Sequence, residues 1–168
     1  MRSSKENVQG FGKTGLSLFI DANTIVSGLL FSGNEALLLK LGAAGACRLL
    51  TTEQVMGEVA QTLRAEEFKF SAEEAAALLS SAYRAVQVHA NVRESELENR
   101  YDRLNDKKDV HVLAAFETLK CDMLATGDKE LLAKVSAAKT TRKTLEAALQ
   151  GTRLDPRDCL SSRRFGPR

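Results

Sequence analysis

The stretch that decides the fold is SLFIDANTIVSGLLFSGN, residues 17–34. It opens with an apolar run, Leu18-Phe19-Ile20, which lacks the alternation of polar residues that marks a half-exposed strand. Asp21 ends this run, and the chain then becomes apolar again with helical spacing. The stretch therefore predicts a buried strand over 16–20, an acid at its carboxyl end, and a helix over 22–31.

The rest of the chain repeats this succession of strands and helices. Thr51 with Gln54, and Ser71 with Glu74, form capping-box patterns that predict where two helices begin. The polar segment 91–106 is predicted to be a loop with at least one helical turn. The alternation predicts a three-layer α/β/α domain with a mainly parallel sheet of about four to five strands. Further strands are predicted over 47–51, 86–89, 122–126 and 137–141, and helices over 35–45, 52–64, 72–86, 109–120, 128–135 and 142–150.

Length and charge fit one soluble domain. The 168 residues divide into a predicted flexible leader over 1–15, an α/β domain over 16–150 and a basic tail over 151–168. The formal net charge is +2, so any binding of nucleic acid must depend on local basic patches. No apolar run reaches the roughly 18–20 residues of a membrane span, and the polar N-terminus lacks the apolar segment of a signal peptide. These features predict a cytoplasmic protein with no membrane contact.

Cysteine and histidine are too sparse for a zinc site. Cys47, Cys121 and Cys159 are scattered without a CxxC pair, and His89 and His111 are the only histidines. Reduced thiols in an intracellular protein are the simplest interpretation.

Asp21 and Asp128 each follow an apolar strand and precede a predicted helix. An acid in this position is commonly the N-cap of the helix, which is the ordinary structural interpretation of both residues. The carboxyl ends of parallel strands, however, meet at one edge of the sheet, where ligands bind in open α/β folds. Both acids are therefore candidates for a shared site.

Two further acids border the apolar faces of predicted helices. Glu58 lies beside Val59 at the edge of a buried face, where a single Glu is usually solvated. Asp109 begins a helix in line with its apolar stripe, and its ordinary role is a favourable interaction with the helix dipole. Asp106 lies three residues earlier and is the more natural cap, which weakens a purely structural interpretation of Asp109.

Carboxylates that converge in one partly dry cleft repel one another strongly. A divalent cation relieves this repulsion, and oxygen ligands without Cys or His select hard ions such as Mg²⁺ or Mn²⁺. Such ions support the hydrolysis of phosphate esters, because they activate water and stabilise charge on the phosphate.

Four segments resemble the motifs of the PIN-domain nucleases, in the same order. They are FIDANTIVSGLL, TTEQVMGEVAQTL, DKKDVHVLAAF and DMLATGDKELL. The resemblance covers about residues 16–150, and it is closest to the bacterial PIN ribonucleases of toxin–antitoxin pairs. Position by position, the acids of the family correspond to Asp21, Glu58, Asp109 and Asp128.

The resemblance implies a metal-dependent endoribonuclease that hydrolyses RNA phosphodiester bonds and leaves a 5′-phosphate. The four acids would be catalytic and would hold Mg²⁺ or Mn²⁺. It also implies a small antitoxin protein as partner and, as in many members, a homodimer. Asn23, Ser27 and Thr126 correspond to accessory polar positions, and Asp106 to an outer-sphere neighbour.

Four basic residues flank the acids in the sequence and are candidates for binding the RNA backbone. Each is equally well explained as a solvated surface charge. They are Lys107, Lys108, Lys129 and Arg100.

The sequence also allows other functions. The main alternative is a catalytically silent PIN-like module that binds RNA or a protein. A haloacid-type phosphatase would need a second Asp two residues after the first, where this chain has Asn23, and the P-loop glycine pattern is missing.

Overall fold

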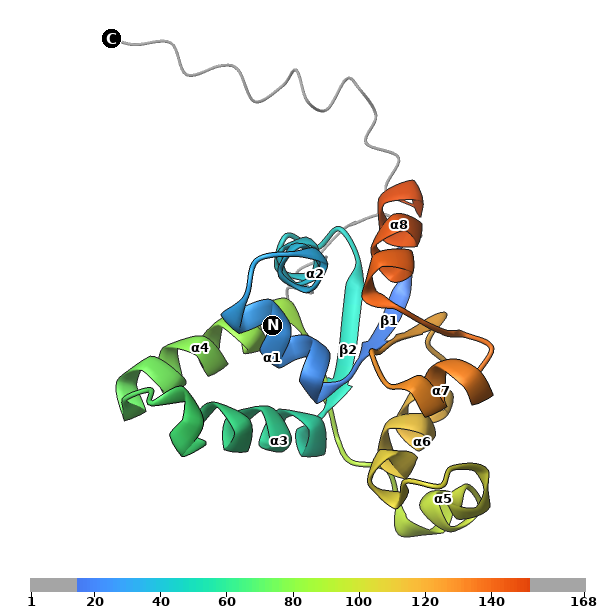
Figure 1. Ribbon diagram of the computed structural model, residues 1–168. Helices are drawn as coiled ribbons and strands as arrows, with labels where there is room; N and C mark the ends of the chain where they lie inside the picture. The colour runs from blue at the N-terminus through green and yellow to red at the C-terminus, as the bar shows by residue number, and fades with distance from the viewer. Residues whose placement is uncertain (1–14, 152–168) are drawn as a thin grey trace, which may run out of the picture.

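Five short parallel strands form the central sheet of the computed structural model, which describes residues 15–151 (Figure 1). They are β1 (Ser17–Ile20), β2 (Arg48–Thr52), β3 (Gln87–His89), β4 (Met123–Ala125) and β5 (Ala138–Lys139). Their order across the sheet is β3-β2-β1-β4-β5, and each neighbouring pair is parallel. The predicted parallel sheet is confirmed, and all of its carboxyl ends lie at one edge.

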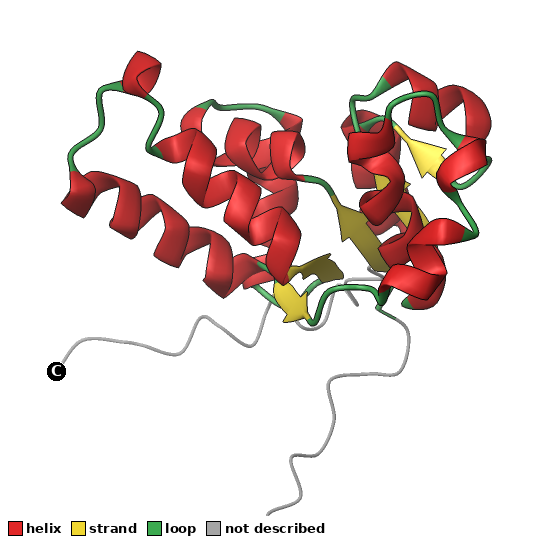
Figure 2. Cartoon of the chain, turned by 90° about the horizontal axis from the view of Figure 1, so that it is seen from below, coloured by secondary structure: helices red, strands yellow, loops and turns green. Residues whose placement is uncertain are grey.

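Helices cover both sides of this sheet. They are α1 (Ala22–Leu30), α2 (Asn34–Ala43), α3 (Glu53–Leu63), α4 (Ala72–Ala85), α5 (Glu94–Glu98), α6 (Val110–Thr118), α7 (Lys129–Lys134) and α8 (Thr141–Gly151). Helices α1 to α4 lie on one side and α5 to α7 on the other (Figures 1 and 2), while α8 packs against α2, β4 and β5. The three-layer α/β/α architecture expected from the sequence is therefore confirmed.

The core explains why β1 carries no polar alternation. β1 lies between β2 and β4, and Leu18, Phe19 and Ile20 are completely buried. Helix α6 is also buried almost all round, because every residue from Val110 to Phe116 is inaccessible to solvent or nearly so. The acids that follow β1 and precede α6 are thus attached to the two most deeply buried elements of the site region.

One of the two predicted capping boxes is confirmed and the other is wrong. The Ser71 hydroxyl accepts from the Glu74 N–H, and the Glu74 carboxylate accepts from the Ser71 N–H. At α3, the N-cap is Thr52 and not Thr51. The reason is that Thr52 still pairs with His89 in the sheet, so β2 runs one residue further than predicted.

Gly42 is required by a close contact between α2 and the chain leading into β3. A Cβ atom on Gly42 would lie 2.5 Å from the Ala85 carbonyl oxygen. Gly42→Ala should therefore destabilise the protein by about 1–3 kcal/mol, the usual cost of overpacking a core. The control is Gly57→Ala in α3, where a Cβ atom meets nothing within 4 Å. There alanine should stabilise the helix by up to about 1 kcal/mol. Thermal melts of the two variants should move in opposite directions.

Some predictions concern residues at the ends of the chain. The leader over 1–15 and the tail over 151–168 fall, except for Gly15 and Gly151, outside the described residues, as does Cys159. Cys47 and Cys121 are free and buried. Within residues 15–151 no single helix is long and apolar enough to cross a membrane, and α1 and α2 meet that requirement only as a pair bent by 96°.

Candidate active site at the carboxyl edge of the sheet

Strand register places Asp21 beside Thr126. Ile20 of β1 is the partner of Ala125 of β4, so the next residue of each strand emerges at the same point of the sheet edge. The Thr126 hydroxyl donates to Asp21 Oδ2 at 2.5 Å, and the Thr24 N–H donates to Asp21 Oδ1 at 2.8 Å. Both oxygens of this buried carboxylate are therefore fixed. The chain leaves β1 toward one side of the sheet and β4 toward the other, which is the arrangement that opens a crevice in α/β folds.

Asp128 is tied to the same threonine. Its backbone N–H donates to Thr126 Oγ1 at 3.0 Å, and its Oδ1 accepts from the Leu131 N–H at 2.8 Å. Asp21 and Asp128 are thus N-caps of α1 and α7, as the ordinary interpretation of each predicts. The capping role is compatible with a functional role, because it holds both carboxylates at the carboxyl edge of the sheet.

The loop before α6 carries Asp106 and Asp109 and is fastened to α7. Asp106 accepts from the Lys108 N–H and so caps the short 3-10 turn Lys107–Asp109. Asp109 makes no capping hydrogen bond with its side chain. Glu130 of α7 accepts from the N–H groups of Asn105, at 2.6 Å, and Asp106, at 3.1 Å. The bond from Asn105, the bond from the Lys134 ammonium and the bond from Asp106 lower the pKa of Glu130 to about 2, and the two backbone bonds hold the loop next to α7.

The carboxyl group of Asp109 has a raised pKa, caused by burial and by the other acids. Burial, followed by repulsion from Asp128, Asp106 and Asp21, raises the pKa of its carboxyl group to about 6. Three separate segments of the chain therefore contribute negative charge to one place.

A cleft of about 630 Å³ collects these groups. All four predicted acids line it, and so do three of the other predicted residues: Asn23, Asp106 and Lys108. The complete lining of described residues is Asp21, Ala22, Asn23, Gln54, Glu58, Gln61, Thr62, Asp106, Lys108, Asp109, Val112 and Asp128.

The remaining predicted polar residues lie outside this lining. Thr126 is buried behind Asp21, where it orients the carboxylate. Ser27 is half-buried in α1.

The basic residues divide in the same way. Arg100 is paired with Glu117 at 2.7 Å, and the Lys107 ammonium bonds to the carbonyl groups of Leu104 and Tyr101. Lys129 is exposed at the start of α7 and is not among the described residues that line the cleft. Lys108 is the one basic side chain among the described residues that line the cleft.

Three polar residues that line this cleft, and one that contacts Glu58 from outside the lining, are not predicted from the sequence. The cleft is lined from α3 by Gln54, Gln61 and Thr62. Their spacing from Glu58 places all of them on one helical face, so the sequence alone could have predicted them. In the sequence, His111 serves only as evidence against a zinc site. It lies inside an apolar helix, and its Nε2 is 2.9 Å from Glu58 Oε1.

The donors fit a hydrated hard cation better than a closed metal cage. Within residues 15–151 no group of three or more His, Cys, Asp or Glu side chains is arranged to hold one ion. Mg²⁺ seldom needs such a group, because it retains several waters and binds through one or two carboxylates together with substrate phosphates. Carboxylates around an open cleft, without thiol or imidazole ligands, match this behaviour.

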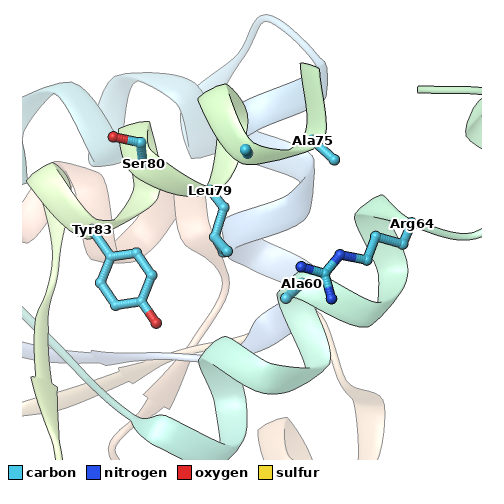
Figure 3. Close-up of a pocket in the computed structure, with 7 residues that line it drawn as sticks. Ala60, Arg64, Ala75, Leu79, Ser80 and Tyr83 are labelled. Atoms are coloured by element: carbon cyan, nitrogen blue, oxygen red, sulfur yellow. The ribbon is translucent and has the colours of Figure 1, made fainter. Parts of the chain in front are cut away.

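A second hollow, of about 310 Å³, lies between α3 and α4. Figure 3 shows Ala60 of α3, Arg64 directly after α3, and Leu79, Ser80 and Tyr83 of α4 around it. None of the described residues that line it is acidic, so it offers no carboxylate to a cation.

Comparisons with solved structures agree with the fold. The chain is similar to PAE2754 from Pyrobaculum aerophilum, with a TM-score of 0.62 and 20% identity over 83% of this chain and 99% of that one. It is also similar to VapC20 of Mycobacterium tuberculosis, described as a Sarcin-Ricin loop cleaving toxin. There the TM-score is 0.50 and the identity 17%, over 69% of this chain and 93% of that one. At these identities the likeness concerns the fold alone, and no curated protein sequence matches the chain.

A family model decides the assignment. The model described as "PIN domain" matches residues 17–130, which is more than half of the chain and includes all four candidate acids. Since the match covers β1 to β4 and every segment that lines the acidic cleft, this protein belongs to the PIN-domain family, whose members are in general hydrolytic nucleases that use divalent metal ions.

Proposed function

We propose that this protein is a metal-dependent endoribonuclease that hydrolyses RNA phosphodiester bonds and acts as the toxin of a toxin–antitoxin pair. The observation that carries the proposal is the acidic cleft, into which four separate segments bring five carboxylates: Asp21, Glu58, Asp106, Asp109 and Asp128. The pKa of Asp109, raised by burial and then by repulsion from the neighbouring acids, supports it, because a bound cation favours the charged carboxylate and relieves that repulsion.

The acids have distinct roles in this proposal. Asp21, Asp109 and Asp128 hold one or two Mg²⁺ or Mn²⁺ ions, directly or through water. Glu58 completes a second metal position or orients the attacking water. The ion, when bound, supplies a Lewis acid that activates water and stabilises negative charge on the phosphate. Thr126 and the Thr24 N–H keep Asp21 oriented before substrate arrives, so no reorganisation is needed during reaction.

The cleft also offers groups that suit RNA. Lys108 can bind a backbone phosphate next to the acids. The amide side chains of Gln54 and Gln61 both donate and accept hydrogen bonds, which suits the 2′-hydroxyls and exposed base edges of single-stranded RNA.

The toxin role and its partner rest on the family resemblance and on the surplus of negative charge. The neighbour VapC20 is described as a toxin that cleaves the Sarcin-Ricin loop. Five carboxylates facing one lysine would attract a small antitoxin that inserts a basic segment into the cleft or covers it. A cytoplasmic location and a homodimer complete the proposal.

Metal removal tests the activity. Single-stranded and structured RNA should be cut in the presence of Mn²⁺, left intact when a chelator is added, and cut again when Mn²⁺ is restored in excess. The products should carry a 5′-phosphate and be degraded by an exonuclease that requires that group. Cleavage that survives the chelator contradicts the proposal. RNA binding without cleavage, together with no heat of Mn²⁺ binding, instead supports the silent binding module.

A further inference from the structure

We propose that His111 is a positioning residue that holds the Glu58 carboxylate in the acidic cleft. The proposal adds a residue to the function proposed above and rests on it for the reaction affected. His111 itself does not line the cleft and is not assigned contact with substrate.

The contact joins two walls of the cleft. Glu58 is on α3 and His111 is on α6, and these helices lie on opposite sides of the sheet. His111 Nε2 lies 2.9 Å from Glu58 Oε1, within hydrogen-bonding distance. The imidazole side chain is only 9% exposed, so the packing of α6 fixes its position.

The surroundings of the ring determine which nitrogen carries the proton. His111 Nδ1 is buried and has no hydrogen-bond partner among the described residues. A proton on Nδ1 would be a buried donor without an acceptor, which is costly. The neutral ring with its proton on Nε2 avoids that cost and donates to Glu58.

Glu58 depends on this contact for its orientation. Its side chain is 42% exposed, and the imidazole is the one polar group of the described residues that contacts its carboxylate. Without the imidazole, several rotamers of this long side chain would be accessible and would have to be given up in each catalytic cycle. A neutral donor fixes Oε1 without cancelling the charge of Glu58, and it leaves Oε2 for the cleft. Outer-shell donors to functional carboxylates act in this way.

A matched pair of substitutions isolates the donor. Gln Nε2 is as many bonds from the backbone as His Nε2, so His111→Gln retains a donor, whereas His111→Met fills similar space without one. His111→Met should lower kcat by about 10- to 100-fold with little change in the KM for RNA, and His111→Gln should recover most of the loss. In a Glu58→Gln background, His111→Met should cause little further loss, because the histidine acts through Glu58.

A measurement without catalysis completes the test. Imidazole ¹⁵N spectra of the wild-type protein should show the Nε2-protonated tautomer, and Glu58→Gln should shift the Nε2 signal. A proton on Nδ1, or a signal that does not respond to Glu58→Gln, overturns the inference even if His111→Met fails to fold. So does an active wild type whose kcat is unchanged in a folded His111→Met variant. A wild type that neither binds Mn²⁺ nor cuts RNA refutes the proposed function instead, and the spectra then still report on the contact.

Discussion

Asp21→Asn should lower RNA cleavage by about 100- to 1,000-fold, the loss typical when one preorganised group of a catalytic site is removed, and should leave the fold intact. Asparagine is as good an N-cap as aspartate, so its side-chain oxygen can still accept from the Thr24 N–H. What changes is the negative charge, together with Oδ2, which becomes an amide nitrogen that offers nothing to a cation and cannot accept from the Thr126 hydroxyl, so Tm should fall modestly although the protein still folds. The measurements are the rate of cleavage at saturating Mn²⁺ and the thermal melt.

Asp122 supplies the control for this prediction. It also contacts β1, but at the opposite edge of the sheet, where its Oδ2 accepts from the N–H and hydroxyl groups of Ser17. Asp122→Asn changes the net charge by the same amount and keeps an acceptor oxygen, so it should cleave RNA at the wild-type rate. An Asp21→Asn protein as active as Asp122→Asn would show that the acidic cleft is not the active site.

Asp109→Asn should lower the rate of RNA cleavage to a similar extent. It should nevertheless stabilise the protein when metal is absent. The carboxyl group of Asp109 has a folded-state pKa of about 6, above its ordinary value of 3.8. It therefore holds its proton more tightly in the folded protein, and the free energy of unfolding falls as pH rises from below 4 to above 6. Asparagine removes the charge that causes this loss.

The size and pH dependence of that gain are specific. Because Asp109 is partly exposed, solvent reduces the effect to about 1 kcal/mol, which raises Tm by roughly 2–4 °C in a domain of this size. The gain should appear in chelator at pH 8 and vanish near pH 4. Asp102→Asn, which removes an exposed acid in the preceding turn, should give no such gain. Equal melting temperatures for Asp109→Asn and wild type at pH 8 would mean that neither burial nor the neighbouring acids disfavour the charged form of Asp109 in the folded protein.

The strands and acids were predictable because each has a local signature. The unbroken apolar run of Leu18 to Ile20 specifies a strand buried on both faces, and an acid directly after such a strand must emerge at the sheet edge. The predicted end of β2 at Thr51 is one residue too early, because Thr52 pairs with His89, which belongs to a strand more than 30 residues away. Local sequence does not contain that pairing.

The groups around the acids were harder to predict, because nearness in sequence is a poor guide to direction. Lys107 and Lys108 are adjacent, yet one ammonium group turns back to carbonyl groups of its own loop and the other side chain lines the cleft. Arg100 does not line the cleft, because its guanidinium group pairs with Glu117 of α6. His111 has only apolar neighbours in the sequence, and only the fold of α6 against the sheet brings it to Glu58.

The threonine between β4 and α7 imposes a direction on its surroundings. A backbone N–H can only donate, so the amide of Asp128 obliges the hydroxyl oxygen of Thr126 to accept, and the single hydroxyl proton must then turn toward Asp21. The two hydrogen bonds therefore point in the same direction: the main-chain N–H donates to the hydroxyl group, and the hydroxyl group donates to the carboxylate. Serine could preserve this sequence of bonds in place of Thr126, whereas valine, of nearly the same shape, would interrupt it at both ends.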